Sequence, residues 1–196
     1  ENKVVWITGG GTGIGKALAL AFGKEGATVS VSGRRQDRLQ GVVDELAAQG
    51  GKGLAVRCDV TDEASVAEAV QKVVRSLGGL DVAVANAGFS VAGRVEKLSA
   101  ADWRRQLDVN VIGVAMTARY AIPHLREREG RLALIGSVAS MLATPGVGAY
   151  AASKYAVRAI GQVLAAELHG SGVSCTTIHP GYIESEIAQV DNQGRF

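Results

Sequence analysis

Near the start of the chain lies the segment Thr8-Gly9-Gly10-Gly11-Thr12-Gly13-Ile14-Gly15. It follows the apolar run Val4 to Ile7 and precedes the helical pattern Lys16 to Gly26. A strand that turns through glycines into a helix presents backbone N–H groups and the positive end of the helix beside the turn. A pyrophosphate fits such a place, so the segment predicts a nucleotide-binding turn.

The glycine spacing supports this interpretation only in context. Gly9, Gly13 and Gly15 have three residues and then one residue between them, so the first gap is wider than in the dinucleotide fingerprint G-x-G-x-x-G. A glycine cluster after a strand is otherwise an ordinary flexible turn. The rest of the chain therefore has to decide between the two.

Apolar, β-branched runs alternate with helical patterns along the chain. Near-continuous apolar strands between amphipathic helices indicate a parallel sheet with helices on both faces. The sequence thus predicts a single doubly wound α/β domain of the Rossmann-like type, spanning residues 1–196. The expected strands are Val4 to Ile7, Thr28 to Ser32, Gly53 to Cys58, Leu80 to Ala85, Arg131 to Ile135 and Val173 to Ile178. Two long helices are expected from Ala101 to Leu125 and from Ala151 to His169.

Composition favours small-molecule chemistry. The 196 residues suffice for one sizeable core, and 21 basic against 19 acidic residues give a net charge of only +2. That balance argues against nucleic acid or a membrane surface as a partner. Cys58 and Cys175 are expected to be buried thiols, and the scattered histidines show no metal-ligand spacing.

No targeting segment is evident in the chain as given. It runs from Glu1-Asn2-Lys3 straight into a strand, so we expect a cytoplasmic protein. The uncharged run Leu132 to Ser153 is long enough to cross a bilayer, but it contains Pro145 and several glycines. We interpret it as a buried strand followed by an active-site loop.

The end of the second strand bears on the choice of cofactor. In a dinucleotide fold an acidic residue there binds the ribose hydroxyls of NAD, whereas an arginine suits the 2′-phosphate of NADP. Here Gly33 takes the place of the acid and Arg34 follows, which favours NADP(H). NAD(H) stays possible because Asp37 is close by, and Arg34 and Arg35 could be solvated loop charges.

Two later strand ends carry further candidates. Asp59, after the third strand, could face an adenine, since ligands bind at the carboxyl ends of parallel strands. Thr61 or Asp62 is a plausible cap for the helix that follows. After the fourth strand, Asn86-Ala87-Gly88 could close a turn or let the backbone approach a cofactor.

With these motifs and a Tyr150-x-x-x-Lys154 pair, the chain resembles the short-chain dehydrogenase/reductase family. The resemblance runs from about Lys3 to about Ile187 and rests on a T-G-x-x-x-G-x-G turn, an N-A-G motif and a Y-x-x-x-K site in the family's order. It implies hydride transfer between a nicotinamide and a carbonyl or secondary alcohol. It also implies a homodimer or homotetramer that pairs the two long helices.

The resemblance assigns roles to four residues. Asn110, unfavourable in a helix by propensity, holds a water in a proton relay. Ser137, with Ser140 as its rival, binds the substrate oxygen, and Tyr150 transfers the proton. Lys154 bonds the nicotinamide ribose, and a cation beside a phenol is expected to lower its pKa.

The resemblance also places Pro180-Gly181 over the nicotinamide, with the backbone of Ile183 at its carboxamide and Ser185 where a threonine is usual. The candidate catalytic residues are Asn110, Ser137, Tyr150 and Lys154. The candidate cofactor-binding residues are Gly9, Gly11, Thr12, Gly13, Ile14, Gly15, Arg34, Asp59, Val60, Asn86, Ala87, Gly88, Tyr150, Lys154, Pro180, Gly181, Ile183 and Ser185. The candidate walls of an apolar substrate pocket are Val91, Met141, Leu142, Val147 and Ile187.

Two other functions remain compatible with the motifs. The same fold supports epimerase or lyase reactions that retain the cofactor, and it could serve as a non-catalytic NADP(H)-binding regulatory protein. Family members usually continue past the position of Phe196 with a helix and a seventh strand, so we expect this chain to lack that segment.

Overall fold

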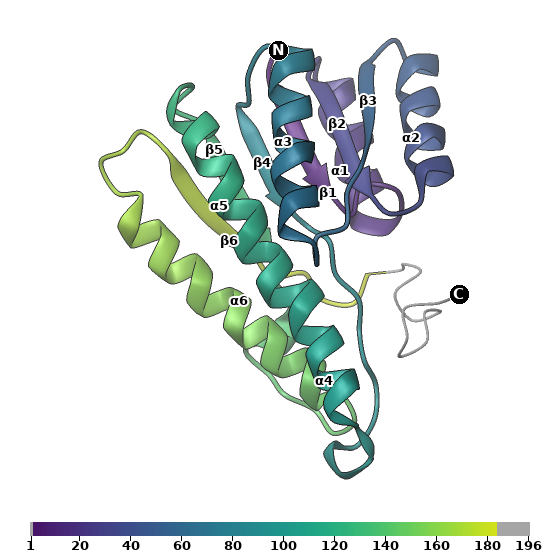
Figure 1. Ribbon diagram of the computed structural model, residues 1–196, viewed down its shortest axis with the longest axis vertical. Coiled ribbons are helices and arrows are strands. Elements are labelled where there is room, and N and C mark those ends of the chain that lie inside the picture. The colour runs from purple at the N-terminus through teal and green to yellow at the C-terminus, as the bar shows by residue number, and fades with distance from the viewer. Residues whose placement is uncertain (1, 184–196) are drawn as a thin grey trace.

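The computed structural model describes residues 2–183, and its centre is a parallel sheet of six strands (Figure 1). The strand order is β3-β2-β1-β4-β5-β6. The strands are β1 (Val4–Thr8), β2 (Thr28–Gly33), β3 (Lys52–Arg57), β4 (Val82–Ala85), β5 (Arg131–Ile135) and β6 (Ser174–Ile178). The order reverses between β1 and β4, which is where doubly wound proteins bind their ligands.

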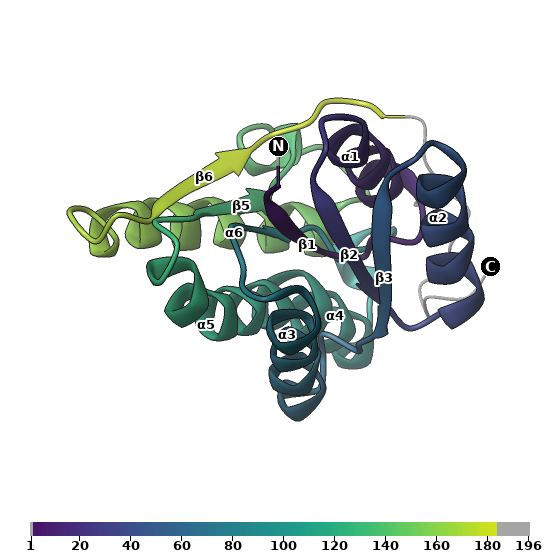
Figure 2. The ribbon, with the colours of Figure 1, turned by 90° about the horizontal axis from the view of Figure 1, so that it is seen from above.

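Helices pack on both faces of this sheet, as predicted (Figure 2). α1 (Gly13–Lys24) and α2 (Gln36–Ala48) share one apolar cluster with β1 and β2. α3 (Glu63–Leu77), α5 (Gly113–Arg126) and α6 (Gly148–Glu167) share the other, with α4 (Ala100–Leu107) before α5. The second cluster includes the fully buried Trp6, whose indole Nε1 donates to Ser32 Oγ at 2.8 Å.

The expected helix Ala101 to Leu125 is not continuous. α4 is followed by a five-residue π-helical turn, Asp108–Ile112, and only then by α5. Asn110, which is unfavourable in a regular helix by propensity, lies in this turn. Short 3₁₀ turns at Val95–Lys97 and Val138–Ser140 complete the described elements.

Other boundaries follow local chemistry. The Asp62 carboxylate caps α3 by accepting from the backbone N–H groups of Ala64 and Ser65, which decides between the two predicted cap residues. α3 ends at Gly78, which has a left-handed backbone. The apolar run from Leu132 forms β5 and the loop after it, and no described helix is long and apolar enough to span a membrane.

Both cysteines are free thiols, but they differ in burial. Cys58 is buried, just beyond the end of β3, whereas Cys175 on the edge strand β6 is only half-buried. Burial raises the pKa of each thiol to about 11. Neither cysteine is therefore set up as a nucleophile near neutral pH.

Candidate active site

The glycine turn after β1 has the shape of an anion cradle. Gly9 and Gly13 have positive φ angles of 65° and 51°, which side chains rarely allow. A Cβ on Gly15 would clash with the backbone carbonyl of Gly9, so only glycine lets α1 approach the turn this closely. The N-cap residue Thr12 forms no side-chain cap bond within residues 2–183, so the first N–H groups of α1 are available to an anion.

Asn86 braces this turn from the neighbouring strand. Its side-chain amide donates to the carbonyl of Thr8 at 3.0 Å and to that of Gly9 at 3.1 Å. The Thr8 hydroxyl in turn accepts from the backbone N–H groups of Asn86 and Ala87. The Asn-Ala-Gly motif therefore meets the glycine motif across the point where the strand order reverses, and Asn86 acts on the turn through its carbonyls.

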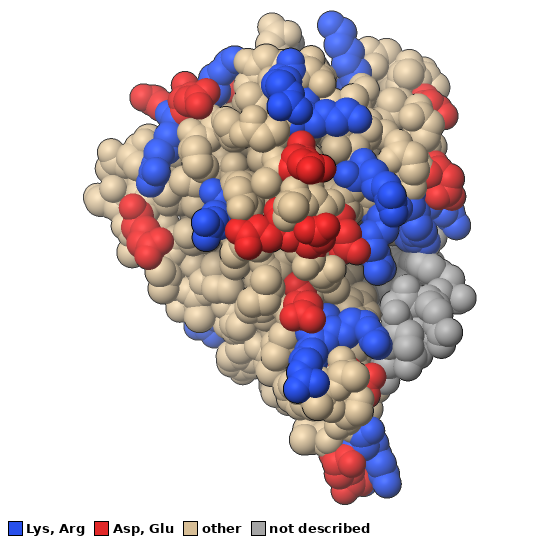
Figure 3. Space-filling model, in the orientation of Figure 1, with Lys and Arg blue, Asp and Glu red and all other residues tan. Residues whose placement is uncertain are grey.

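Basic side chains lie beside the cradle. Arg34 is exposed directly after β2, and Figure 3 shows Lys and Arg side chains gathering over the lower end of α2. A Cβ on Gly11 would lie 3.2 Å from the Cβ of Arg38, so the first turn of α2 packs against the glycine turn. Sequence reasoning missed Arg38, although its position four residues after Arg34 was a signal for a second cation there.

Asp59 and Val60 occupy the end of β3 in different ways. One carboxylate oxygen of Asp59 accepts from the backbone N–H and the hydroxyl of Thr61, at 3.0 and 2.8 Å. The side chain of Val60 is buried against Gly113, at the start of α5. Any contact of Val60 with a cofactor would therefore come from its backbone.

Asn110 links three segments from inside the π-helical turn. It is fully buried, its Oδ1 accepts from Phe89 N at 3.1 Å, and its Nδ2 donates to Phe89 O at 3.0 Å. Nδ2 also donates to Ser153 Oγ at 3.1 Å, between Tyr150 and Lys154 on α6. One turn earlier, the fully buried Gln106 binds the same loop through Val91 N and Phe89 O, a contact that the sequence did not indicate.

Ser137 meets Tyr150 where β5 ends and α6 begins. Burial raises the pKa of the Tyr150 phenol above its ordinary value of 10.0, and a side-chain hydrogen bond with Ser137 opposes that rise. Ser140 is instead held inside its loop, with its hydroxyl donating to Ser137 O. The pair at the crevice is therefore Ser137 with Tyr150.

Lys154 lies beneath the tyrosine. Its amino group donates to the carbonyl of Ile135 at 2.8 Å and lies 5.7 Å from the centre of the Tyr150 ring. Burial lowers the pKa of Lys154 from 10.5 to about 8. The expectation that Lys154 lowers the pKa of Tyr150 is wrong for the groups of this chain, because desolvation of the phenol dominates and the opposing contribution comes from Ser137.

The segment after β6 runs beside the loop that carries Ser137. Val138 N donates to Pro180 O at 2.9 Å, which brings Pro180-Gly181 to the crevice, and Ile183 is exposed further along. Ser185 lies outside the described residues, as does the candidate wall residue Ile187. Gly93, in the segment after β4, and Val147, directly before α6, form an isolated β-bridge that joins these two segments.

The expected walls of that pocket differ in exposure. Val91 is fully buried in a small cluster with Phe89 and Ala149, so it belongs to the core and not to a pocket wall. Met141 and Leu142 have 51% and 64% of their surface exposed, in the loop between β5 and α6. Val147, directly before α6, is half-buried.

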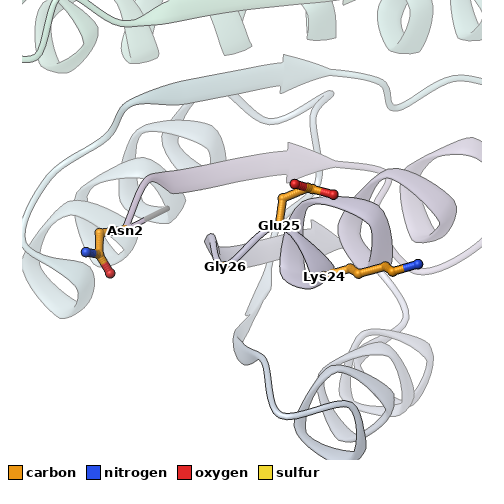
Figure 4. A pocket seen from close by; sticks show the side chains of 4 residues that line it. All are labelled: Asn2, Lys24, Glu25 and Gly26. Atoms are coloured by element: carbon orange, nitrogen blue, oxygen red, sulfur yellow. The ribbon is translucent and has the colours of Figure 1, made fainter.

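A separate hollow lies at the opposite edge of the sheet, at the amino-terminal ends of β1 and β2 (Figure 4). It is lined by Asn2, Lys24, Glu25 and Gly26. Figure 4 shows the side chains of Asn2, Lys24 and Glu25 pointing apart, and none of the candidate catalytic residues lines the hollow. We place the chemistry at the crevice for that reason. The described residues contain no group of side chains that could hold a metal ion.

Fold and site together define a dinucleotide-binding oxidoreductase. A family model described as short chain dehydrogenase matches residues 3–195, and the chain belongs to that family, whose members act on small molecules. An uncharacterized oxidoreductase from Staphylococcus aureus is 35% identical over 192 residues, which is 97% of this chain and 82% of that protein.

Two similar solved structures are complexes with NAD or with an NADP derivative. A short-chain dehydrogenase/reductase from Burkholderia phymatum in complex with NAD aligns with a TM-score of 0.94 at 31% identity, over 96% of this chain and 69% of that one. An alcohol dehydrogenase from Thermococcus sibiricus complexed with 5-hydroxy-NADP aligns with a TM-score of 0.91 at 31% identity, over 100% and 81%. The relatives of this chain thus include one protein seen with NAD and one seen with an NADP derivative.

Proposed function

We propose that this protein transfers a hydride between NADP(H) and the carbonyl or secondary-alcohol carbon of a small molecule. The observation that carries the proposal is the convergence of Ser137, Tyr150 and Lys154. The half-buried phenol of Tyr150 is hydrogen-bonded to the Ser137 hydroxyl, and the buried amino group of Lys154 lies 5.7 Å from the centre of the phenol ring. This arrangement can bind one substrate oxygen and move a proton to or from it.

The glycine cradle fits a nicotinamide dinucleotide, whose nicotinamide ring supplies the hydride when bound. The chain's own residues do the remaining work. Ser137 orients the substrate oxygen, and Tyr150 gives its proton to that oxygen during reduction. The raised pKa keeps the phenol protonated at neutral pH, as a proton donor needs. Lys154 and Asn110 belong to the relay that returns a proton to Tyr150.

The turnover test compares two tyrosines on the same helix. Tyr150→Phe should lower kcat for reduction of aldehydes and ketones by about 100-fold or more, because a proton donor contributes roughly that much. Tyr155→Phe, on the partly exposed face of α6, should leave kcat unchanged. Normal turnover by Tyr150→Phe would refute the assignment, and product formation without net cofactor turnover would point to an epimerase or lyase.

The preference for NADP(H) is argued from charge. Exposed Arg34 follows Gly33 at the end of β2, where a 2′-phosphate would sit, and a guanidinium suits phosphate. Arg34→Ala should weaken NADPH binding about 10-fold and leave NADH binding within twofold, because one charge-assisted contact is lost. Arg75→Ala in the last turn of α3 is the matched control. Equal affinities for both cofactors in the wild-type protein would count against the preference.

The exposed apolar residues around the crevice fit an apolar substrate. We also propose a cytoplasmic enzyme that works as a homodimer or homotetramer through its long helices. If the protein binds NADPH but turns over no carbonyl or alcohol, a regulatory role is favoured instead.

A further inference from the structure

The loops after β5 and β6 run side by side past the ends of their strands. Gly136 N donates to Ile178 O at 2.7 Å, and Val138 N donates to Pro180 O at 2.9 Å. A parallel ladder would continue with a bond from the residue at position 180 back to the first loop. Pro180 has no backbone N–H with which to make it. One backbone bond of the ladder is therefore missing between the two loops.

Two side chains connect these loops. Ser140 is fully buried, and its hydroxyl donates to Ser137 O at 2.5 Å. The Ser140 Oγ atom lies 2.7 Å from Nδ1 of the half-buried His179. Nδ1 also lies 3.3 Å from Ser137 O. A Cβ on Gly136 would lie 2.7 Å from that nitrogen, so the imidazole is seated against bare backbone.

This network assigns the tautomer of the histidine. A serine hydroxyl has one proton, and in Ser140 that proton is given to the carbonyl of Ser137. The Ser140 oxygen must then accept from His179, so Nδ1 carries a proton. The other contact of Nδ1 is the carbonyl oxygen of Ser137, which can only accept and so also favours a protonated Nδ1.

We propose that His179, acting through Ser140, is a positioning residue for the catalytic hydroxyl of Ser137. Ser137 O accepts from both the backbone N–H and the hydroxyl of Ser140, so the imidazole fixes the main chain of the residue that meets Tyr150. On the far side, Arg158 of α6 donates to Ser140 O at 3.4 Å. The inference rests on the proposed function, because it names what holds that function's serine.

Asn and Asp side chains are nearly equal in size, so replacing His179 by each in turn separates the effect of hydrogen-bond donation from the effect of side-chain volume. His179→Asn keeps an N–H donor close to the position of Nδ1, whereas His179→Asp offers only acceptors to Ser140 Oγ and Ser137 O. We expect His179→Asn to keep kcat within about threefold and His179→Asp to lower it by about 10- to 100-fold, because small misplacements of a catalytic group have effects of that size. The affinity for NADPH should change by less than about twofold in both, since neither touches the glycine cradle.

The control is His169→Asp, which makes the same change at an exposed position just after the end of α6 and should leave kcat unaltered. A Ser137→Ala background tests the route of the effect. If His179 acts through Ser137, adding His179→Asp to Ser137→Ala should lower kcat no further. Losses that multiply in the double variant, or an equal loss in His179→Asn and His179→Asp, would overturn the inference.

A measurement without turnover separates this inference from the proposed function. Nitrogen NMR of the wild-type protein, at a pH where the ring of His179 is neutral, should show the proton on Nδ1. A proton on Nε2 alone would overturn the inference whatever the activity. If no carbonyl or alcohol is turned over but the Nδ1–H form is found, the proposed function fails while the assigned network stands.

Discussion

Lys154 couples folding to pH through a single buried amino group. Its pKa in the folded protein is lowered from 10.5 to about 8, whereas an unfolded chain keeps the ordinary value. Between these values the unfolded state binds more protons than the native state, so the free energy of unfolding rises with pH. Below about pH 8 the amino group is charged in both states, and its contribution no longer varies with pH.

This linkage can be isolated with Lys154→Met. The difference in unfolding free energy, wild type minus variant, should rise by about 2 kcal/mol between about pH 8 and about pH 10, from the value of one pKa unit. Urea denaturation at a series of pH values measures it, and taking the difference cancels the other titrating groups. A difference that does not change with pH would mean that the native amine titrates as it does in water.

The residues of the site were predictable to different degrees. Tyr150 and Lys154 are four apart in sequence, so their pairing could be predicted from spacing alone. The direction of the tyrosine's pKa shift could not, because it depends on how deeply the fold buries the phenol. His179 was expected to be a structural residue, and its contacts with Ser140 and Ser137 could not be predicted because these partners lie 39 and 42 residues earlier in the chain. Only the pairing of β5 with β6 brings them together.

At the scale of elements, replacing a helical glycine by alanine should have opposite effects in α1 and in α2. A Cβ on Gly15 would meet Asn86 Nδ2 at 2.6 Å and the Cα of Gly10 at 2.9 Å, whereas a Cβ on Gly41 meets nothing within 4 Å. Gly15→Ala should therefore abolish measurable NADPH binding and lower the melting temperature. Gly41→Ala should leave binding intact and raise stability by about 0.5–1 kcal/mol. Thermal unfolding with and without NADPH measures both, and a Gly15→Ala variant that binds normally would contradict the close approach of α1.

The cap of α3 gives a second element-scale prediction. The Asp62 carboxylate accepts from Ala64 N at 3.0 Å and from Ser65 N at 3.4 Å. Asp62→Ala should lower the free energy of unfolding by about 1 kcal/mol, because these N–H groups lose their partner. Glu68→Ala, exposed in the middle of α3, should change it by less than about 0.5 kcal/mol. Equal effects in urea denaturation would show that the cap contributes nothing.

Periodicity located these elements to within a few residues, apart from the π-helical turn. The expected helix Ala101 to Leu125 has an apolar pattern compatible with a continuous α-helix. What widens one of its turns is the pull of Asn110 toward the backbone of Phe89 and toward Ser153, and both partners lie outside the helix. A pattern along one helix does not contain that information.

For the whole molecule, the alternation of strands and helices predicted the doubly wound architecture, but not how each strand is covered. β6 was expected to be an apolar buried strand, yet Ser174, Thr176 and Ile178 are exposed. The reason is its place at the edge of the sheet, beside β5 alone among the described strands. Edge position depends on strand order, which no local sequence pattern reveals.

The proposed assembly is testable at this scale. Val163 of α6 is apolar and 54% exposed, on one of the two long helices expected to pair between subunits. Sedimentation velocity should show a dimer or tetramer for the wild-type chain and a shift toward monomer for Val163→Asp, because a buried unpaired charge disfavours association. Ala47→Asp on α2 should not alter the sedimentation. A wild-type protein that sediments only as a monomer would refute the proposal.

The π-helical turn also determines the directions in which the residues before it and after it face. A regular α-helix turns by about 100° per residue, so the extra residue in Asp108–Ile112 rotates everything after it relative to everything before it. Gln106 and Asn110 can thereby face the loop at Phe89 while Ala118 and Ala121 face the core. Deleting one residue here would straighten the helix, and either the loop or the core would then lose its contacts. We therefore expect relatives that keep both sets of contacts to have the same number of residues between the positions of Ala100 and Arg126.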